Sequence, residues 1–247
     1  MFTAGLSTAE LFFFITTTEV ISIPTGLIFL GALGTIWGGQ LWLRTPMLFA
    51  LAVVFNFLIG GLTGIFLADV FTDIHLQDTF FVVAHFHYTI VGAGIFGLFA
   101  GIYYWFPKIT GRTYSEHLAQ LHFWWTFLSF NLTFLPMFWL GLNGMNRRIA
   151  VYPEELEFLN LLVSLGGFSL GASFLVFLYN ILKSWIRGPV AEADPWRART
   201  LEWQTSSPPP VENFTEAPRV VSGPYDYGSP STAHAVFGAS TNPDGAG

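Results

Sequence analysis

The 247-residue sequence contains no cysteine, which excludes a disulfide scaffold, a thiolate-held iron–sulfur cluster and a cysteine-based zinc site. Charge is also scarce. Asp, Glu, Lys and Arg make up 11% of the residues, whereas ordinary globular chains carry about 25%. The net charge of −6 argues against nucleic acid as a partner, because nucleic-acid-binding surfaces are basic.

Hydrophobic and aromatic residues are abundant instead. They include 27 Phe and 9 Trp, and hydrophobic residues make up 52% of the chain; so few charges cannot cover a soluble surface of this size. Five stretches reach the length of about 20 apolar residues that a membrane-spanning helix needs. They are residues 10–32, 47–69, 79–106, 118–143 and 157–185. Because these runs are continuous and not alternating, the sequence predicts an all-α membrane protein with five transmembrane helices.

The C-terminal part of the chain has a different composition. Residues 188–247 hold 9 of the 14 prolines and no long apolar run. Such segments stay extended or disordered. The sequence therefore predicts a transmembrane region over residues 1–187 and a Pro-rich tail over residues 188–247, either disordered or laid over the membrane region as a strap. The first span lacks the basic region of a cleavable signal peptide and should be retained.

The basic residues divide unequally between the two sides of the membrane. If the C-terminus is cytoplasmic, or on the equivalent matrix side, that side holds eight of the ten. They are Arg44, Lys108, Arg112, Lys183, Arg187, Arg197, Arg199 and Arg219. This distribution fits the positive-inside rule. The opposite side holds only Arg147 and Arg148, an adjacent pair that requires an anionic partner.

The third stretch contains two histidines, His85 and His87, well inside hydrocarbon, where ionisable side chains are costly and usually functional. Positions two apart lie about 200° around a helix, so the imidazoles project from opposite sides and cannot easily share one metal. Each could ligate its own haem, with Phe86 between them. The alternative is a pair of packed histidines with satisfied hydrogen bonds. Three glycines on the same two faces would let a flat macrocycle approach the helix: Gly92, Gly94 and Gly101.

The first stretch carries a polar stripe at helical spacing. Thr18, Ser22 and Thr25 align at i, i+4 and i+7, and Glu19 lies one position off. Hydroxyl groups at this depth often hydrogen-bond between helices, but a carboxyl group there is typical of a proton relay. Both readings fit the stripe. Pro24 should loosen the helix locally.

Several motifs together resemble the C-terminal half of the catalytic subunit I of haem–copper terminal oxidases of the cytochrome c oxidase type. They are Ile23-Pro24-Thr25-Gly26, Gly60-Gly61-Leu62-Thr63-Gly64, Asp78-Thr79, Ala84-His85-Phe86-His87-Tyr88, Asn131-Leu132-Thr133-Phe134, Gly144-Met145, Arg147-Arg148, Tyr152-Pro153 and Thr200-Leu201-Glu202-Trp203. The resemblance extends from Met1 to about residue 228. Residues 229–247 match no motif of the family.

The resemblance implies how the two haems would be held. His85 would be the axial ligand of the high-spin haem where oxygen binds. His87 would be one of two axial ligands of the low-spin haem, and Phe86 would lie between the haems. Both haems would be of the A type. Arg147, Arg148 and Asp73 would surround the propionates.

The resemblance also implies a Mg²⁺ site and a proton path, and the sequence departs from the family at both. Asp78 would bind Mg²⁺, but Gln77 stands where the family usually has His, so the second ligand would be Gln77 or His75. Thr25 would line a proton path. Ile28 stands where the family usually has Lys, which makes Glu19 the candidate substitute.

The resemblance finally implies a larger assembly. In the family, Met1 corresponds to a position just after two histidines that ligate copper, so we expect copper and the N-terminal half of subunit I on a partner chain. Further expected partners are a CuA-bearing subunit II, subunit III, cytochrome c and the lipid bilayer. The complex would reduce O₂ to water and translocate protons in a bacterial inner membrane or, alternatively, a mitochondrial one. A quinol oxidase and a non-redox five-span structural subunit are the competing interpretations.

Overall fold

The computed structural model describes residues 5–221, 223 and 235–236, so most of the stretch 229–247 and Met1 lie outside the described residues. Within the described residues, five helical segments are long and apolar enough to cross a membrane. They are Thr8–Ile36, Thr45–Ala68, Phe80–Thr110, Glu116–Leu142 and Glu154–Arg187. Each one overlaps a predicted span and differs from it by a few residues at the ends. The prediction of an all-α protein with five transmembrane helices is therefore confirmed.

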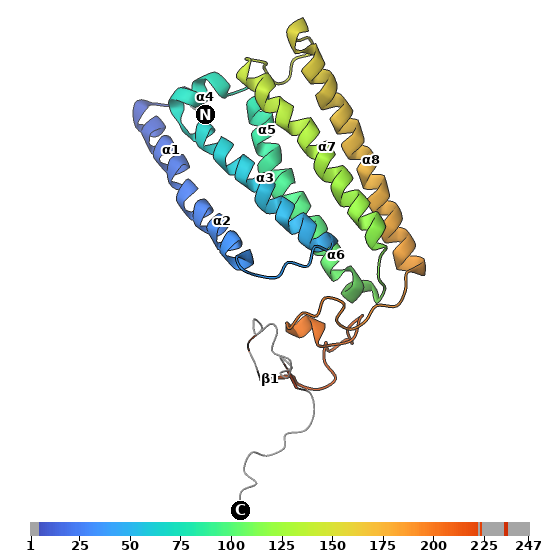
Figure 1. Ribbon diagram of the computed structural model, residues 1–247. Helices are drawn as coiled ribbons and strands as arrows, with labels where there is room; N and C mark the ends of the chain where they lie inside the picture. Colours follow the sequence, from blue (N-terminus) through green and yellow to red (C-terminus); the bar gives the residue numbers. More distant parts are fainter. Residues whose placement is uncertain (1–4, 222, 224–234, 237–247) are drawn as a thin grey trace, which may run out of the picture. The chain divides into compact units, whose positions relative to one another are not determined.

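The first span is divided into two helices, α1 (Thr8–Val20) and α2 (Ser22–Ile36), which meet at Ile21 (Figure 1). Pro24 explains the break, because proline has no N–H to donate to the carbonyl four residues earlier. The Ser7 hydroxyl accepts from the N–H of Glu10 and the Glu10 carboxylate accepts from the N–H of Ser7, a capping box that starts α1.

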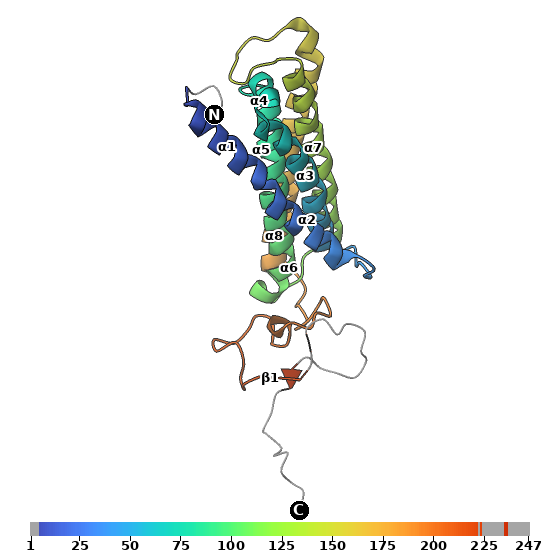
Figure 2. The same ribbon diagram turned by 90° about the vertical axis from the view of Figure 1, so that its left-hand side faces the viewer.

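The next two spans and the short helix between them contain the helices that carry the glycine and histidine motifs. They comprise α3 (Thr45–Ala68), the short α4 (Val70–Leu76), α5 (Phe80–Thr89), a π-helical segment over Ile90–Ile95, and α6 (Phe96–Thr110). α5 packs against both α3 and α7 (Glu116–Leu142), and Figure 2 shows α3, α5 and α7 running close together. π-helical turns are rare in proteins, and those that occur are often found at functional sites. This one directly follows the segment with the two histidines.

Hydroxyl groups join α7 to the last helix, α8 (Glu157–Arg187), which a 3₁₀ turn over Glu154–Leu156 precedes. The Ser169 hydroxyl accepts from the indole N–H of Trp125 at 2.8 Å and lies 2.8 Å from the Ser129 hydroxyl. The hydroxyls of Thr126 and Ser173 are also 2.8 Å apart. Such contacts are a usual means of holding helices together in lipid.

The interior of the bundle is largely aromatic. Phe49 of α3 contacts the rings of Phe96, Phe123 and His122 at centroid distances of 5.0–5.6 Å. His122 is fully buried and also contacts the rings of Phe99 and Phe177, whereas His117 is exposed. The edge-to-face contacts of Phe49 with Phe96 and Phe123 add to the stabilisation that burial of the rings provides.

The chain divides into two compact units, residues 1–102 with 116–179, and residues 103–115 with 180–247. In the second unit, the tail predicted from residue 188 is not wholly extended. It contains a 3₁₀ turn over Leu201–Trp203 and a strand, β1 (Arg219–Val220), which pairs antiparallel with β2 (Ala235–Val236).

Lys108 anchors this unit. Its side chain is buried, and Nζ donates to the carbonyl oxygens of Ala193, Thr205 and Ser206 at 3.0, 2.8 and 3.2 Å. The ammonium group also lies 5.0 Å from the ring centroid of Trp203, a cation–π contact. One helix residue thus holds three separate backbone positions of the tail.

Candidate functional site

His85 projects from α5 toward α3, and its ring is held by a backbone carbonyl. Nδ1 lies 3.0 Å from the carbonyl oxygen of Gly60 and 3.2 Å from the hydroxyl of Thr63. A carbonyl oxygen can only accept, so Nδ1 carries the proton and Nε2 keeps its lone pair. This is the tautomer that binds a metal through Nε2, with an outer partner fixing the ring.

Glycines on α3 make this approach possible. A Cβ atom at Gly60 would lie 2.9 Å from Cγ2 of Thr89 and 3.1 Å from its backbone nitrogen. At Gly64 a Cβ atom would lie 3.0 Å from Cε1 of His85. The Gly60–Gly64 motif therefore lets α5 and the imidazole lie directly against α3.

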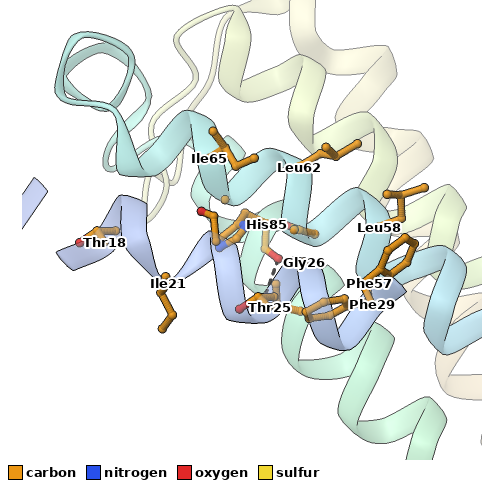
Figure 3. Close-up of a pocket in the computed structure, with 15 residues that line it drawn as sticks. Thr18, Ile21, Thr25, Gly26, Phe29, Phe57, Leu58, Leu62, Ile65 and His85 are labelled. Carbon is orange, nitrogen blue, oxygen red and sulfur yellow. Dashed lines mark hydrogen bonds between the residues drawn. The ribbon is translucent and has the colours of Figure 1, made fainter. Parts of the chain in front are cut away.

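A cavity of about 450 Å³ opens beside the His85 ring. Its walls come from α1, α2, α3 and α5, and His85 and Thr89 are its α5 residues. Figure 3 shows Thr18 and Thr25 from the first span and His85 from α5 around the same space. The volume falls in the usual range for ligand pockets, about 300–1,000 Å³.

The predicted polar stripe faces this cavity. Thr18, Ser22 and Thr25 all line it. Glu19 is half-buried on α1 and is not among the lining residues, and the side chain of Ile28 is 74% exposed on the outer surface of the isolated chain. The structure therefore brings the three hydroxyl residues to His85 but not the carboxyl group.

His87 projects against a different helix, as the predicted 200° separation requires. Its ring stacks on Phe134 of α7, with centroids 4.1 Å apart and planes 16° apart. Nδ1 lies 2.7 Å from the carbonyl oxygen of Val83, one turn earlier on α5. Because this carbonyl oxygen can only accept, Nδ1 carries the proton, and Nε2 of His87 remains available to a metal. Phe86 lies beside this ring, with centroids 4.4 Å apart.

The glycines predicted to receive a macrocycle have different surroundings. Gly92 is buried, and a Cβ atom there would lie 2.8 Å from Cβ of Asn56, so protein and not a ligand covers it. Gly94 is exposed, with no atom within 4 Å of its Cβ position, and Gly101 is half-buried. Gly94 therefore leaves the face of the helix open, whereas Gly92 does not.

The loop motifs form one interface at the N-terminal end of α5. The Thr79 hydroxyl caps α5 by accepting from the N–H of Phe81 at 3.2 Å. Thr79 pairs as an antiparallel bridge with Asn146, and the N–H of Arg147 donates to the carbonyl of Asp78 at 2.8 Å. Gly141 makes this packing possible, because a Cβ atom there would collide with the backbone of Phe81.

This pairing brings Arg147 to Asp78. Nε and Nη2 of Arg147 donate to the same carboxylate oxygen, Oδ1, at 2.9 and 2.5 Å. These hydrogen bonds hold the pKa of Asp78 below its ordinary value. Arg148, with φ of +66°, is exposed. The adjacent arginines therefore differ: one is paired with a carboxylate, and the other faces outward.

The remaining predicted loop residues are spread over α4 and its end. Asp73 is buried, and burial raises the pKa of its carboxyl group. His75 is exposed and lines a second cavity with Thr72 and Asn143, and Gln77 ends α4. Among the described residues, no three His, Asp or Glu side chains gather closely enough to hold a metal ion. Asp78 and its neighbours alone do not form a complete Mg²⁺ site.

The sequence reasoning missed the residues that support the histidines. Gly60, Thr63 and Phe134 contact the imidazoles, but they entered only as parts of a family resemblance. Asn131 was also missed; its Oδ1 accepts from the hydroxyl of the buried Tyr88, next to His87 in the sequence, at 2.8 Å. The spacing of Gly60 and Gly64 on one helix face was the signal that could have located the contact with α5.

Comparison with known proteins places the chain in one family. Residues 1–169 match the family described as "Cytochrome C and Quinol oxidase polypeptide I". Cytochrome c oxidase subunit 1 of Synechocystis sp. is 51% identical over 228 residues, which are 92% of this chain and 41% of that protein. The probable cytochrome c oxidase subunit 1-beta of Nocardia farcinica is 50% identical over 212 residues, 84% of this chain and 36% of that protein.

A solved structure has the same fold. A chain from a heme-copper terminal oxidase dimer superimposes with a TM-score of 0.59 at 18% identity, over 78% of this chain and 41% of that one. The chain spans about two fifths of the length of the curated relatives it matches. The predicted resemblance is confirmed: the chain belongs to the family of cytochrome c and quinol oxidase polypeptide I.

Proposed function

We propose that this chain forms the haem-ligating part of subunit I of a terminal oxidase, which reduces O₂ to water with electrons from cytochrome c and translocates protons. One observation carries the proposal. Both His85 and His87 direct Nδ1 to a backbone carbonyl oxygen, at 3.0 and 2.7 Å, and so hold Nε2 free for a metal. The alternative is a pair of packed histidines with both ring nitrogens hydrogen-bonded. That alternative does not require Nε2 to stay free in both residues.

The residues fit two haems, one on each histidine. His85 would ligate the high-spin haem from the wall of the 450 Å³ cavity, and His87 would ligate the low-spin haem. When bound, haem iron supplies oxygen binding and electron transfer. The chain's own contribution is to fix the two imidazoles, through Gly60 for His85 and through the stacked Phe134 for His87. Both haems are proposed to be of the A type.

The charged loop residues would bind the haem propionates. Guanidinium groups recognise carboxylates through parallel hydrogen bonds. Arg148 is exposed and has its donors available, whereas Arg147 would share its donors between a propionate and Asp78. Asp73, a buried acid, would sit beside these carboxylates.

Proton delivery is proposed along the first span. The hydroxyls of Thr18, Ser22 and Thr25 line the cavity beside His85, so a proton can pass along them through water. Glu19 would supply protons to this row from the adjacent face of α1, in the absence of a lysine at position 28. Because Glu19 is not among the residues of the cavity wall, it would act as a donor to the row and not as a member of it.

The Mg²⁺ proposal depends on ligands beyond this chain. Asp78 would provide Oδ2, because Arg147 occupies Oδ1. Gln77 or His75 would provide a second donor, and Mg²⁺ prefers about six ligands, several of them water. The remaining protein ligand would come from another subunit.

The curated relatives are longer than the region that this chain matches. The part of subunit I outside that region would complete the assembly. That part would supply the active-site copper ligands and the second ligand of the low-spin haem, as the N-terminal half of subunit I. The other partners would be a CuA-bearing subunit II and subunit III. The chain would lie in a bacterial inner membrane, or in a mitochondrial one, with its C-terminus on the cytoplasmic or matrix side.

Spectroscopy and a donor assay on the purified complex test this function. We expect an intense Soret band, two spectrally distinct haems, copper, and O₂ consumption with reduced cytochrome c. Consumption with quinol but not cytochrome c, and no CuA-bearing subunit, would assign the complex as a quinol oxidase. A complex without haem would instead establish a non-redox structural subunit.

A further inference from the structure

Two acceptors on α3, one turn apart, meet the same nitrogen of His85. Nδ1 is 3.0 Å from the carbonyl oxygen of Gly60 and 3.2 Å from Oγ1 of Thr63. The haem-ligating role of His85, on which this inference rests, requires only that one acceptor fix the ring. The second acceptor is a side chain, and a side chain can be changed without moving the backbone.

The direction of each hydrogen bond follows from chemistry. The Gly60 carbonyl accepts, so Nδ1 is the donor. The Thr63 hydroxyl must therefore accept from Nδ1 as well, and its own proton is directed to the carbonyl oxygen of Ile59 at 2.8 Å or of Gly60 at 3.0 Å. A hydroxyl that donates its proton becomes a better acceptor, because hydrogen bonds in a chain polarise one another.

The position of Thr63 makes it specific to His85. Thr63 and Gly60 are three residues apart and so lie on one face of α3. Cε1, the ring atom bonded to Nδ1, meets Gly64, where a Cβ atom would lie 3.0 Å away. The imidazole thus lies against both a hydroxyl group and a glycine of α3, which limits its rotation.

We propose that Thr63 is a positioning residue for His85, whose hydroxyl shares the Nδ1 proton with the Gly60 carbonyl. Sharing the proton draws it away from the ring and makes Nε2 the stronger electron donor, as carboxylate or carbonyl partners do for other metal-bound histidines. Thr63 would therefore set both the orientation of the His85 ring and the strength of its bond to iron. It does not touch the iron or the substrate.

The test compares Thr63→Val with Thr63→Ser in the purified complex. Valine keeps the shape of threonine but removes the acceptor, and serine restores the hydroxyl. The readout is the iron–imidazole stretching band of the reduced high-spin haem, measured by resonance Raman spectroscopy. We expect Thr63→Val to shift the band to lower frequency and Thr63→Ser to keep the wild-type position. Thr35→Val is the matched control, because that hydroxyl bonds only its own helix, to the Gly31 carbonyl at 2.8 Å.

An unchanged band in Thr63→Val would overturn the proposal. If valine prevents haem loading, Thr63→Ala replaces it in the same comparison. Loss of haem from the valine and alanine variants but not from serine would support the role of the hydroxyl, and loss from all three would contradict it. Absence of an iron–imidazole band from the wild-type complex would instead refute the haem-ligating function itself, so the two failures are distinguishable.

Discussion

The Nδ1 atom of His85 lies 3.0 Å from the carbonyl oxygen of Gly60, so a helix backbone holds the imidazole. The close approach of α5 to α3 leaves no room for a side chain at position 60, where a Cβ atom would lie 2.9 Å from Thr89. The glycine therefore has two functions: it permits the helix contact, and its carbonyl then fixes the tautomer of the residue that the contact brings in.

Enlarging Gly64 should displace the His85 ring. In Gly64→Ala, the new Cβ atom would lie 3.0 Å from Cε1, so the ring must move by a few tenths of an ångström. Overpacking of this kind costs about 1–3 kcal/mol, and we expect an altered high-spin haem spectrum with the low-spin haem unchanged. Gly167→Ala is the control, since nothing lies within 4 Å of its Cβ position. Identical spectra for the two variants would show that Gly64 does not confine the ring.

Removing the polar groups of the first span should slow proton delivery to the cavity beside His85. Thr25→Val takes a hydroxyl from the cavity wall, and Glu19→Gln removes a carboxyl group outside it. We expect each to slow reduction of the high-spin haem, by roughly tenfold for a barrier increase of about 1.4 kcal/mol, with haem content unchanged. Stopped-flow reduction measures this. Wild-type kinetics in Glu19→Gln, with slowing in Thr25→Val, would reduce Glu19 to a structural residue.

The Arg147–Asp78 ion pair should set the pH at which the Asp78 carboxylate takes up a proton. Because Arg147 lowers the pKa of Asp78, the ion pair is present at neutral pH and is lost only as the pH falls through that lowered pKa. In Arg147→Gln the pKa should return toward its ordinary value, so Asp78 should protonate at a higher pH. Infrared titration of the carboxyl band, identified with Asp78→Asn, measures the shift. Arg148→Gln should cause a smaller one, and equal shifts would refute the pairing.

Replacing Lys108 should release the tail. Lys108→Met keeps the aliphatic stem but leaves the carbonyl oxygens of Ala193, Thr205 and Ser206 without their shared donor. A hydrogen bond to a charged donor contributes about 1.5–3 kcal/mol. We expect faster limited proteolysis between residues 193 and 213, with the haem spectrum unchanged. Lys183→Met, a change of an exposed lysine, is the control. Equal proteolysis rates in the wild type and Lys108→Met would contradict the anchoring role.

Hydrophobic length alone predicted the five spans, because crossing a bilayer requires about 20 apolar residues whatever their neighbours. Helical periodicity predicted that His85 and His87 project apart, and that Thr18, Ser22 and Thr25 share a face. Both predictions concern one helix at a time, and the directions of side chains around one helix follow from their spacing in the sequence.

Contacts between helices could not be derived in this way. The sequence gives no distance between Thr63 and His85, or between Phe134 and His87, because these depend on how α3 and α7 pack against α5. Gly92 shows the limit clearly: it was predicted to let a macrocycle approach the helix, but Asn56 lies against it. The partner of Arg147 was likewise expected to be a propionate, and within this chain it is Asp78.

The proposed function depends most on the assignment of His85 and His87 to different haems. The direct test is the reduced-minus-oxidised visible spectrum of the purified complex carrying His85→Asn or His87→Asn, with CO binding as a second signal. We predict that His87→Asn abolishes the low-spin haem signal, and that His85→Asn leaves this signal but removes normal CO binding at the high-spin haem. Both haem signals intact in either variant, with wild-type activity, would contradict the account.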